Sequence, residues 1–164
     1  MSVAYRVRQA GKALGGALHE GERREIGSVL SPRLMDIFLT MGPLGQRHGY
    51  NVYRTLVESG QRDPDLLTAG LLHDSGKGRH GLPSRSAWVL LGLLGSEVRT
   101  GMAKHRLLGR LFGLRQSLHH AESGAHVVKD VGGSDTLVRL IRDHKRPQTG
   151  DPLLSALQAA DDAN

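Results

Sequence analysis

Among the histidines and aspartates of the chain, which are residue types that bind divalent metals, six occur at inward-facing positions of their helical segments. The chain contains no cysteine, so a metal ion would have to be held by histidine, aspartate or glutamate. The six residues are His48, His73, Asp74, His120, His144 and Asp161. Metal binding is therefore the first chemistry to test against the sequence.

The pair His73-Asp74 ends the most apolar helical segment of the chain. Asp63 and Pro64 are suited to begin this helix, and the stretch LLTAGLL that follows is apolar nearly all round, as in a helix buried on every side. An imidazole and a carboxylate at the end of such a helix need a partner charge, a hydrogen bond or a metal ion. Pairing of Asp74 with Lys77, beside a hydrogen-bonded core histidine, is the alternative to a metal site.

Helical spacing places two further histidines on the apolar sides of their helices. His48 shares a stripe with Val52, and His144 follows Ile141 by three residues. A single inward histidine is more often a hydrogen-bonded core residue than a metal ligand. Several inward histidines on different helices therefore indicate a metal site more strongly than any single one does.

Helical spacing also places His120 and Asp161 on different helix faces from their neighbours in the sequence. His120 lies on the stripe of Val127, whereas His119 lies nearer a polar face. Asp161 follows an apolar stripe of leucines, whereas Asp162 follows a polar one. Four inward histidines and two inward aspartates on five helices are costly to bury without a shared cation, which favours a metal site.

The wider pattern predicts an all-α fold of about seven to eight helices, because almost no segment alternates between apolar and polar residues. Residues 1–30 contain five glycines and are expected to form a flexible or weakly helical arm. Ser31-Pro32 is a helix start. The predicted helices cover about 32–40, 45–58, 64–74, 85–94, 97–112, 121–131, 135–144 and 151–162.

The charge of the chain is concentrated in one stretch. The net charge is +6, and residues 79–115 contain seven Lys or Arg against Glu97 alone. Such a stretch favours anionic partners, which could be phosphorylated small molecules, nucleic acid or anionic lipid. Nucleic acid is the less favoured of these, because only Trp88 and Phe112 are available there for stacking on bases.

Neither a membrane span nor a signal peptide is expected. The longest apolar run, AWVLLGLLG at 87–95, is far shorter than the roughly 20 residues that a spanning helix needs. The apolar stretch near the amino terminus, at 13–18, is too short for a signal peptide. These features predict a cytoplasmic protein, in which the 87–95 run is either core or the contact of a homo-oligomer.

The order of the six residues resembles the HD-domain superfamily of metal-dependent phosphohydrolases. DPDLLTAGLLHDSGKG is similar to the LLAALLHDIGK segment of its HDIG branch, and HAESGAHVV to the HPEIGAELL segment. The resemblance covers residues 34–164 and implies an HD domain over 31–164 with a basic helical insertion at about 84–114. Ser75 stands where that branch usually has Ile or Val, and Ala121 where it often has Pro. No GYP signature follows, so the resemblance does not extend to the HD-GYP branch.

The resemblance also implies how the six residues are used. One divalent ion would be bound by His48, His73, Asp74 and Asp161. His120 and His144 would complete a second site, with Asp74 bridging the two ions. One or two ions per chain are therefore expected, with manganese or iron favoured and cobalt, nickel, zinc or magnesium also suited to these ligands.

For the reaction, the resemblance implies hydrolysis of a phosphate mono- or diester, such as a nucleotide or cyclic dinucleotide, by a metal-activated hydroxide. Asp74 and Lys77 would be the catalytic residues, Lys77 either binding the substrate phosphate or only neutralising Asp74. The residues expected to bind the phosphate are Lys77, Arg79, Arg85, Arg106 and Arg110. The arginines would otherwise belong to a solvated helix face.

Two alternatives to a hydrolase remain at this point. An HD domain can serve as a sensory or scaffolding module that binds a nucleotide or metal without turnover. The second alternative is a helical nucleic-acid-binding domain based on residues 79–115. Strongly salt-dependent binding of oligonucleotides that survives EDTA would favour this alternative.

Overall fold

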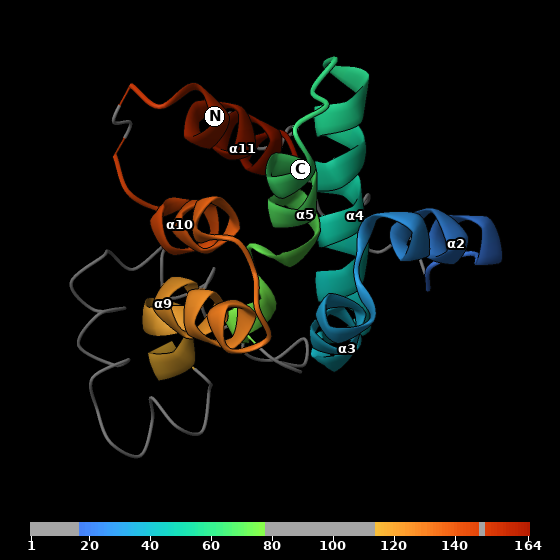
Figure 1. Cartoon of the computed structure of the whole chain (residues 1–164), viewed down its shortest axis with the longest axis horizontal. Helices are drawn as coiled ribbons and strands as arrows, with labels where there is room; N and C mark the ends of the chain where they lie inside the picture. Colours follow the sequence, from blue (N-terminus) through green and yellow to red (C-terminus); the bar gives the residue numbers. More distant parts are fainter. Residues whose placement is uncertain (1–16, 78–113, 148–149) are drawn as a thin grey trace.

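A computed structural model describes residues 17–77, 114–147 and 150–164, without the side chains of residues 114–119. Within these ranges the chain is helical and contains no strand, which confirms the predicted all-α fold (Figure 1). The helices are α2 (Glu20–Val29), α3 (Pro32–Thr40), α4 (Pro43–Glu58), α5 (Pro64–Leu72), the short 3₁₀ helix η1 (Ser75–Lys77), α9 (Leu114–Asp130), α10 (Asp135–Asp143) and α11 (Pro152–Asp162).

Helix α5 is the centre of the fold, as its uniformly apolar sequence predicts. It packs against α4 on one side and against α10 and α11 on the other (Figure 1). Leu66, Leu71 and Leu72 are fully buried. The Asp63 side chain accepts a hydrogen bond from the Leu66 amide at 2.9 Å, so the predicted cap is present. The α5 helix ends at Leu72, so that His73 and Asp74 lie where the chain turns into η1.

The second part of the flexible or weakly helical arm expected over residues 1–30 contains a helix. Residues 20–29 form α2, and Ile26 in its middle is almost fully buried. Arg47 of α4 donates hydrogen bonds to both carboxylate oxygens of Glu22, at 2.6 and 2.8 Å, and Tyr50 donates one to Glu25 at 2.7 Å. Burial and these bonds outweigh the cost of glycine in α2. Residues 1–16 lie outside the described part.

Two further expectations concern the middle of the chain. Helix α9 begins at Leu114, seven residues before the predicted start at 121, so the helix reaches into the end of the expected insertion. The predicted helices at 85–94 and 97–112, the rest of the insertion and the apolar run at 87–95 all lie outside the described residues.

Glycines allow the helices that carry the inward histidines to approach closely. A Cβ atom on Gly49 of α4 would lie 2.5 Å from the carbonyl oxygen of Leu71 in α5. A Cβ atom on Gly76 of η1 would lie 1.9 Å from the carbonyl oxygen of His120 in α9. Real Cβ atoms do not come this near, so only glycine fits at these two contacts.

Candidate metal centre

The six inward residues predicted from the sequence come together at one place between the helices. Each is placed by a different helix or helix end, except that His73 and Asp74 share the turn after α5. The contributing positions are His48 on α4, His73 and Asp74 after α5, His120 on α9, His144 directly after α10, and Asp161 on α11. The centre is therefore assembled from residues more than a hundred positions apart in the sequence.

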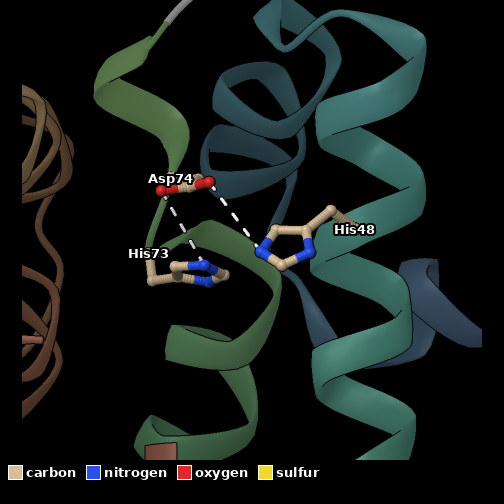
Figure 2. Close-up of side chains that lie close together, drawn as sticks. All are labelled: His48, His73 and Asp74. Atoms are coloured by element: carbon tan, nitrogen blue, oxygen red, sulfur yellow. Dashed lines mark ion pairs between the residues drawn. The ribbon is translucent and has the colours of Figure 1, made fainter. Parts of the chain in front are cut away.

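The first group of ligand atoms surrounds His48 and His73. These two side chains and Asp74 bring their ligand atoms within 4.8 Å of one another, and Figure 2 shows both rings directed toward the Asp74 carboxylate. Asp161 Oδ1 lies 3.0 Å from His48 Nε2 and 3.4 Å from His73 Nε2. The structure thus brings together the four residues that the resemblance assigned to one ion.

The second group shares Asp74 with the first. Asp74, His120 and His144 also bring their ligand atoms within 4.8 Å of one another. Asp74 Oδ1 lies 3.5 Å from His120 Nε2 and 3.9 Å from His144 Nε2, while Oδ2 lies 3.9 Å from His48 Nε2. Oδ1 also lies 3.8 Å from His73 Nε2, so the Asp74 carboxylate faces imidazoles of both groups, as a bridging ligand would.

Backbone carbonyls orient two of the rings. His73 Nδ1–H donates to the Gly70 carbonyl at 3.1 Å, and His144 Nδ1–H donates to the Ile141 carbonyl at 2.6 Å. A carbonyl only accepts, so these bonds require the proton on Nδ1 and leave the Nε2 lone pair of each neutral ring facing the carboxylates. This is how metal-binding histidines are commonly held.

Several buried atoms of the centre have no hydrogen-bond partner among the described residues. They include His73 Nε2, Asp74 Oδ1 and His144 Nε2, each of which can donate an electron pair. Burying such atoms unpaired is costly, and a shared cation removes the cost. The donor set of imidazole nitrogens and carboxylate oxygens thus fits a divalent transition metal.

The electrostatics of the centre keep the Asp74 carboxylate ionised and the His144 ring neutral. Burial raises the pKa of Asp74, but the charges of His73 and Lys77 lower it by more, so the pKa lies well below its usual value. Burial alone would lower the pKa of His73, and the adjacent Asp74 and Asp161 carboxylates reverse the shift. Burial, followed by the neighbouring His73, lowers the pKa of His144 to about 3. Ionised carboxylates and a neutral His144 are the forms that bind metals.

Lysines contact the outer oxygens of both carboxylates. Lys77 Nζ lies 2.6 Å from Asp74 Oδ2, so the pairing that the sequence offered as an alternative to a metal site exists beside the candidate site. Lys145 Nζ forms an ion pair with Asp161 Oδ2. The arginines predicted to bind phosphate, Arg79, Arg85, Arg106 and Arg110, lie outside the described residues.

Sequence reasoning missed Lys145 and Gln158. Lys145 directly follows His144, and Gln158 lies one helical turn before Asp161, so adjacency to a predicted ligand was the available signal. The predicted stripe on α9 also needs a correction. Val127 is exposed and Val128 is buried, so Val128 lies on the inward face with His120 where the sequence predicted Val127.

Metal content should distinguish Asp161 from its neighbour Asp162. Asp161 faces two imidazoles, whereas the Asp162 side chain is exposed. Asp161→Ala should lower the metal content of purified protein, because it removes one of the four ligands expected for the first ion. His120→Ala should also lower it, and Asp162→Ala should leave it nearly unchanged. Elemental analysis measures all three, and the reverse order of effects would contradict the assigned helix faces.

Comparison with known families agrees with the geometry of the centre. The HD domain family model matches residues 41–163, a range that begins just before α4 and includes all six residues of the centre. No curated protein and no solved structure gave a match. Among the described helices, none has the length and apolar character needed to cross a membrane. Because the family match spans most of the chain and contains every helix that contributes to the centre, the chain belongs to the HD-domain superfamily of metal-dependent phosphohydrolases.

Proposed function

We propose that the protein hydrolyses a phosphate mono- or diester, of the nucleotide or cyclic dinucleotide type, with one or two divalent metal ions as cofactor. The observation that supports this most directly is the buried carboxylate of Asp74, which lies within 3.9 Å of the Nε2 atoms of all four histidines and belongs to both groups of candidate ligands. A buried carboxylate in this position is suited to hold two cations close together. Membership of the superfamily supports the same chemistry.

The ligands would be divided between two ions. His48, His73, Asp74 and Asp161 would hold the first ion, and Asp74, His120 and His144 the second. When bound, such ions activate a water molecule at neutral pH and stabilise the charge that develops on phosphoryl oxygens. Manganese or iron suits this ligand set best, and cobalt, nickel, zinc or magnesium are further candidates.

The protein's own groups would orient the reactants and limit the entry of water. The hydrogen bonds of His73 and His144 to backbone carbonyls hold two ligand rings in place before any ion binds. Asp74, His73 and His144 are buried, which strengthens the electrostatic interactions within the centre. Lys77, close to Asp74, would bind the substrate phosphate, and Arg79, Arg85, Arg106 and Arg110 remain predicted contributors to that binding.

The proposal is tested by metal analysis combined with a turnover screen. Protein prepared without chelator should contain between one and two transition-metal ions per chain and should hydrolyse members of a panel of nucleotides, cyclic dinucleotides and simple phosphate esters. Prolonged EDTA treatment should abolish turnover, and added manganese or iron should restore it. Fully loaded protein that binds a panel member tightly without turnover would instead support a sensory or scaffolding module. Protein that binds no metal after reconstitution would contradict the proposed hydrolase.

A further inference from the structure

Two partly exposed lysines border the mostly buried carboxylates of the candidate metal centre. The side chain of Asp74 is 3 % exposed and that of Asp161 is 11 % exposed, whereas Lys77 is 30 % and Lys145 is 51 % exposed. Both lysines contact the outer oxygen of a carboxylate whose other oxygen faces imidazoles. Each carboxylate of the centre therefore has a partly exposed ammonium group beside it.

Helix α11 anchors the backbone on both sides of Lys145. Gln158 Nε2 donates to the carbonyl oxygen of His144 at 3.2 Å and to that of Arg146 at 2.7 Å. The residues before and after Lys145 are therefore attached to the helix that carries Asp161. This holds the Cα of Lys145 in place and leaves its half-exposed side chain able to change partners.

The ion pair of Lys145 with Asp161 is not a strong obstacle to such a change. The Lys145 side chain is half exposed, so water can solvate its ammonium group when it leaves Asp161. The Asp161 carboxylate is mostly buried, and a bound divalent ion would replace the lysine as its partner. The ammonium group would then gain more from a phosphate oxygen than from its original partner.

The charges around the centre indicate which anion it would accept. Asp74 and Asp161 contribute two negative charges, and the two lysines that contact them contribute two positive charges. With the imidazoles as neutral ligands, the charges of these four side chains sum to zero. Each bound divalent ion therefore adds two positive charges that the side chains do not neutralise. A phosphate monoester carries nearly two negative charges at neutral pH, whereas a diester carries one.

From these observations, and resting on the phosphohydrolase function proposed above, we propose that Lys145 is a substrate-binding residue that acts with Lys77 to select a terminal phosphate monoester over a diester. The proposal narrows the substrate to molecules that carry a dianionic phosphate group. It assigns Lys145 a role in binding the phosphate and none in binding the metal.

The test measures binding first, with manganese-loaded protein and two probes that require no turnover. Orthophosphate represents the dianion, and dimethyl phosphate represents the monoanionic diester. By calorimetric titration, the unaltered protein should bind orthophosphate at least about tenfold more tightly than dimethyl phosphate. Lys145→Met should weaken orthophosphate binding about tenfold and dimethyl phosphate binding by less, with metal content unchanged.

Two further variants serve as controls. Lys145→Arg should retain most of the orthophosphate affinity, because it keeps the charge at the same place. Lys129→Met makes the same change in net charge at an exposed position of α9 and should have no effect on phosphate affinity. For a hydrolysed monoester, Lys145→Met should raise KM about tenfold and change kcat by less than about threefold, since the contact would be made in ground and transition states alike.

Specific results would overturn the proposal. Unchanged orthophosphate affinity in Lys145→Met would do so, as would equally tight binding of dimethyl phosphate by the unaltered protein. Loss of metal in Lys145→Met would show that the residue only positions Asp161. Failure of the proposed function would give a different result from failure of this proposal. A protein that shows the expected affinities for orthophosphate but no turnover would support the role of Lys145 in binding and contradict only the hydrolase.

Discussion

Replacing Asp74 with alanine should lower the hydrolysis of any phosphoester substrate by at least about a hundredfold, the scale expected when metal-based charge stabilisation is lost. Asp74 is the residue common to both groups of candidate ligands, and its oxygens face His48 on one side and His120 and His144 on the other. Without it, the imidazoles lose the anion that would hold two cations together. Initial rates at saturating manganese measure the effect.

The fold should survive this substitution. Removing a buried carboxylate also removes the cost of its desolvation, so helicity measured by circular dichroism should be largely retained. Asp74→Asn keeps the shape of the side chain without its charge and should lose activity to a similar extent, while Asp162→Ala should retain activity. Lys77→Ala should be milder and act mainly on KM. An Asp74→Ala protein with full activity and two bound ions would refute the bridging role.

The second large effect is expected for Gly76→Ala, which should destabilise the protein by about 3 kcal/mol. The added Cβ would lie 1.9 Å from the His120 carbonyl oxygen and 2.6 Å from the Gly124 amide nitrogen, and both are backbone atoms that cannot rotate away. The 3₁₀ helix and α9 would have to separate. Chemical unfolding in the presence of EDTA measures the loss without a contribution from bound metal.

A matched substitution separates close packing from the general effect of adding a methyl group. Gly27→Ala lies in the last turn of α2, where the new Cβ would meet only the end of the Met35 side chain at 3.9 Å. It should stabilise the protein by about 0.5–1 kcal/mol, because alanine is the better helix former. Equal stabilities of the two variants would show that η1 and α9 do not approach as closely as the structure has them.

The sequence by itself determined the class of the fold and which side chains point toward the candidate metal centre. Helical spacing depends only on local geometry, so it showed which face of a helix is apolar and therefore that His48, His144 and Asp161 point inward. The caps Ser31 and Asp63 were predictable for the same reason, since each acts within one turn. The resemblance to the HD superfamily added the grouping of the ligands.

Local spacing was less reliable where packing between helices decides the outcome. Glycines suggested a weak helix before residue 30, yet burial of Ile26 and hydrogen bonds from α4 stabilise α2. On α9 the predicted stripe contained Val127, and the structure buries Val128 in its place. In both cases the decisive contacts come from a neighbouring helix, whose orientation the sequence pattern does not specify.

Only the tertiary structure decided how the residues of the centre face one another. That the Asp74 carboxylate faces imidazoles of both groups depends on the relative placement of α4, α5, α9 and α10, which approach one another at glycine contacts. The pairing of Lys145 with Asp161 joins residues on either side of the α10–α11 connection, and no periodicity within one helix reports on it. Helical periodicity identifies the inward face of each helix, whereas the partner across the interface depends on how the helices pack.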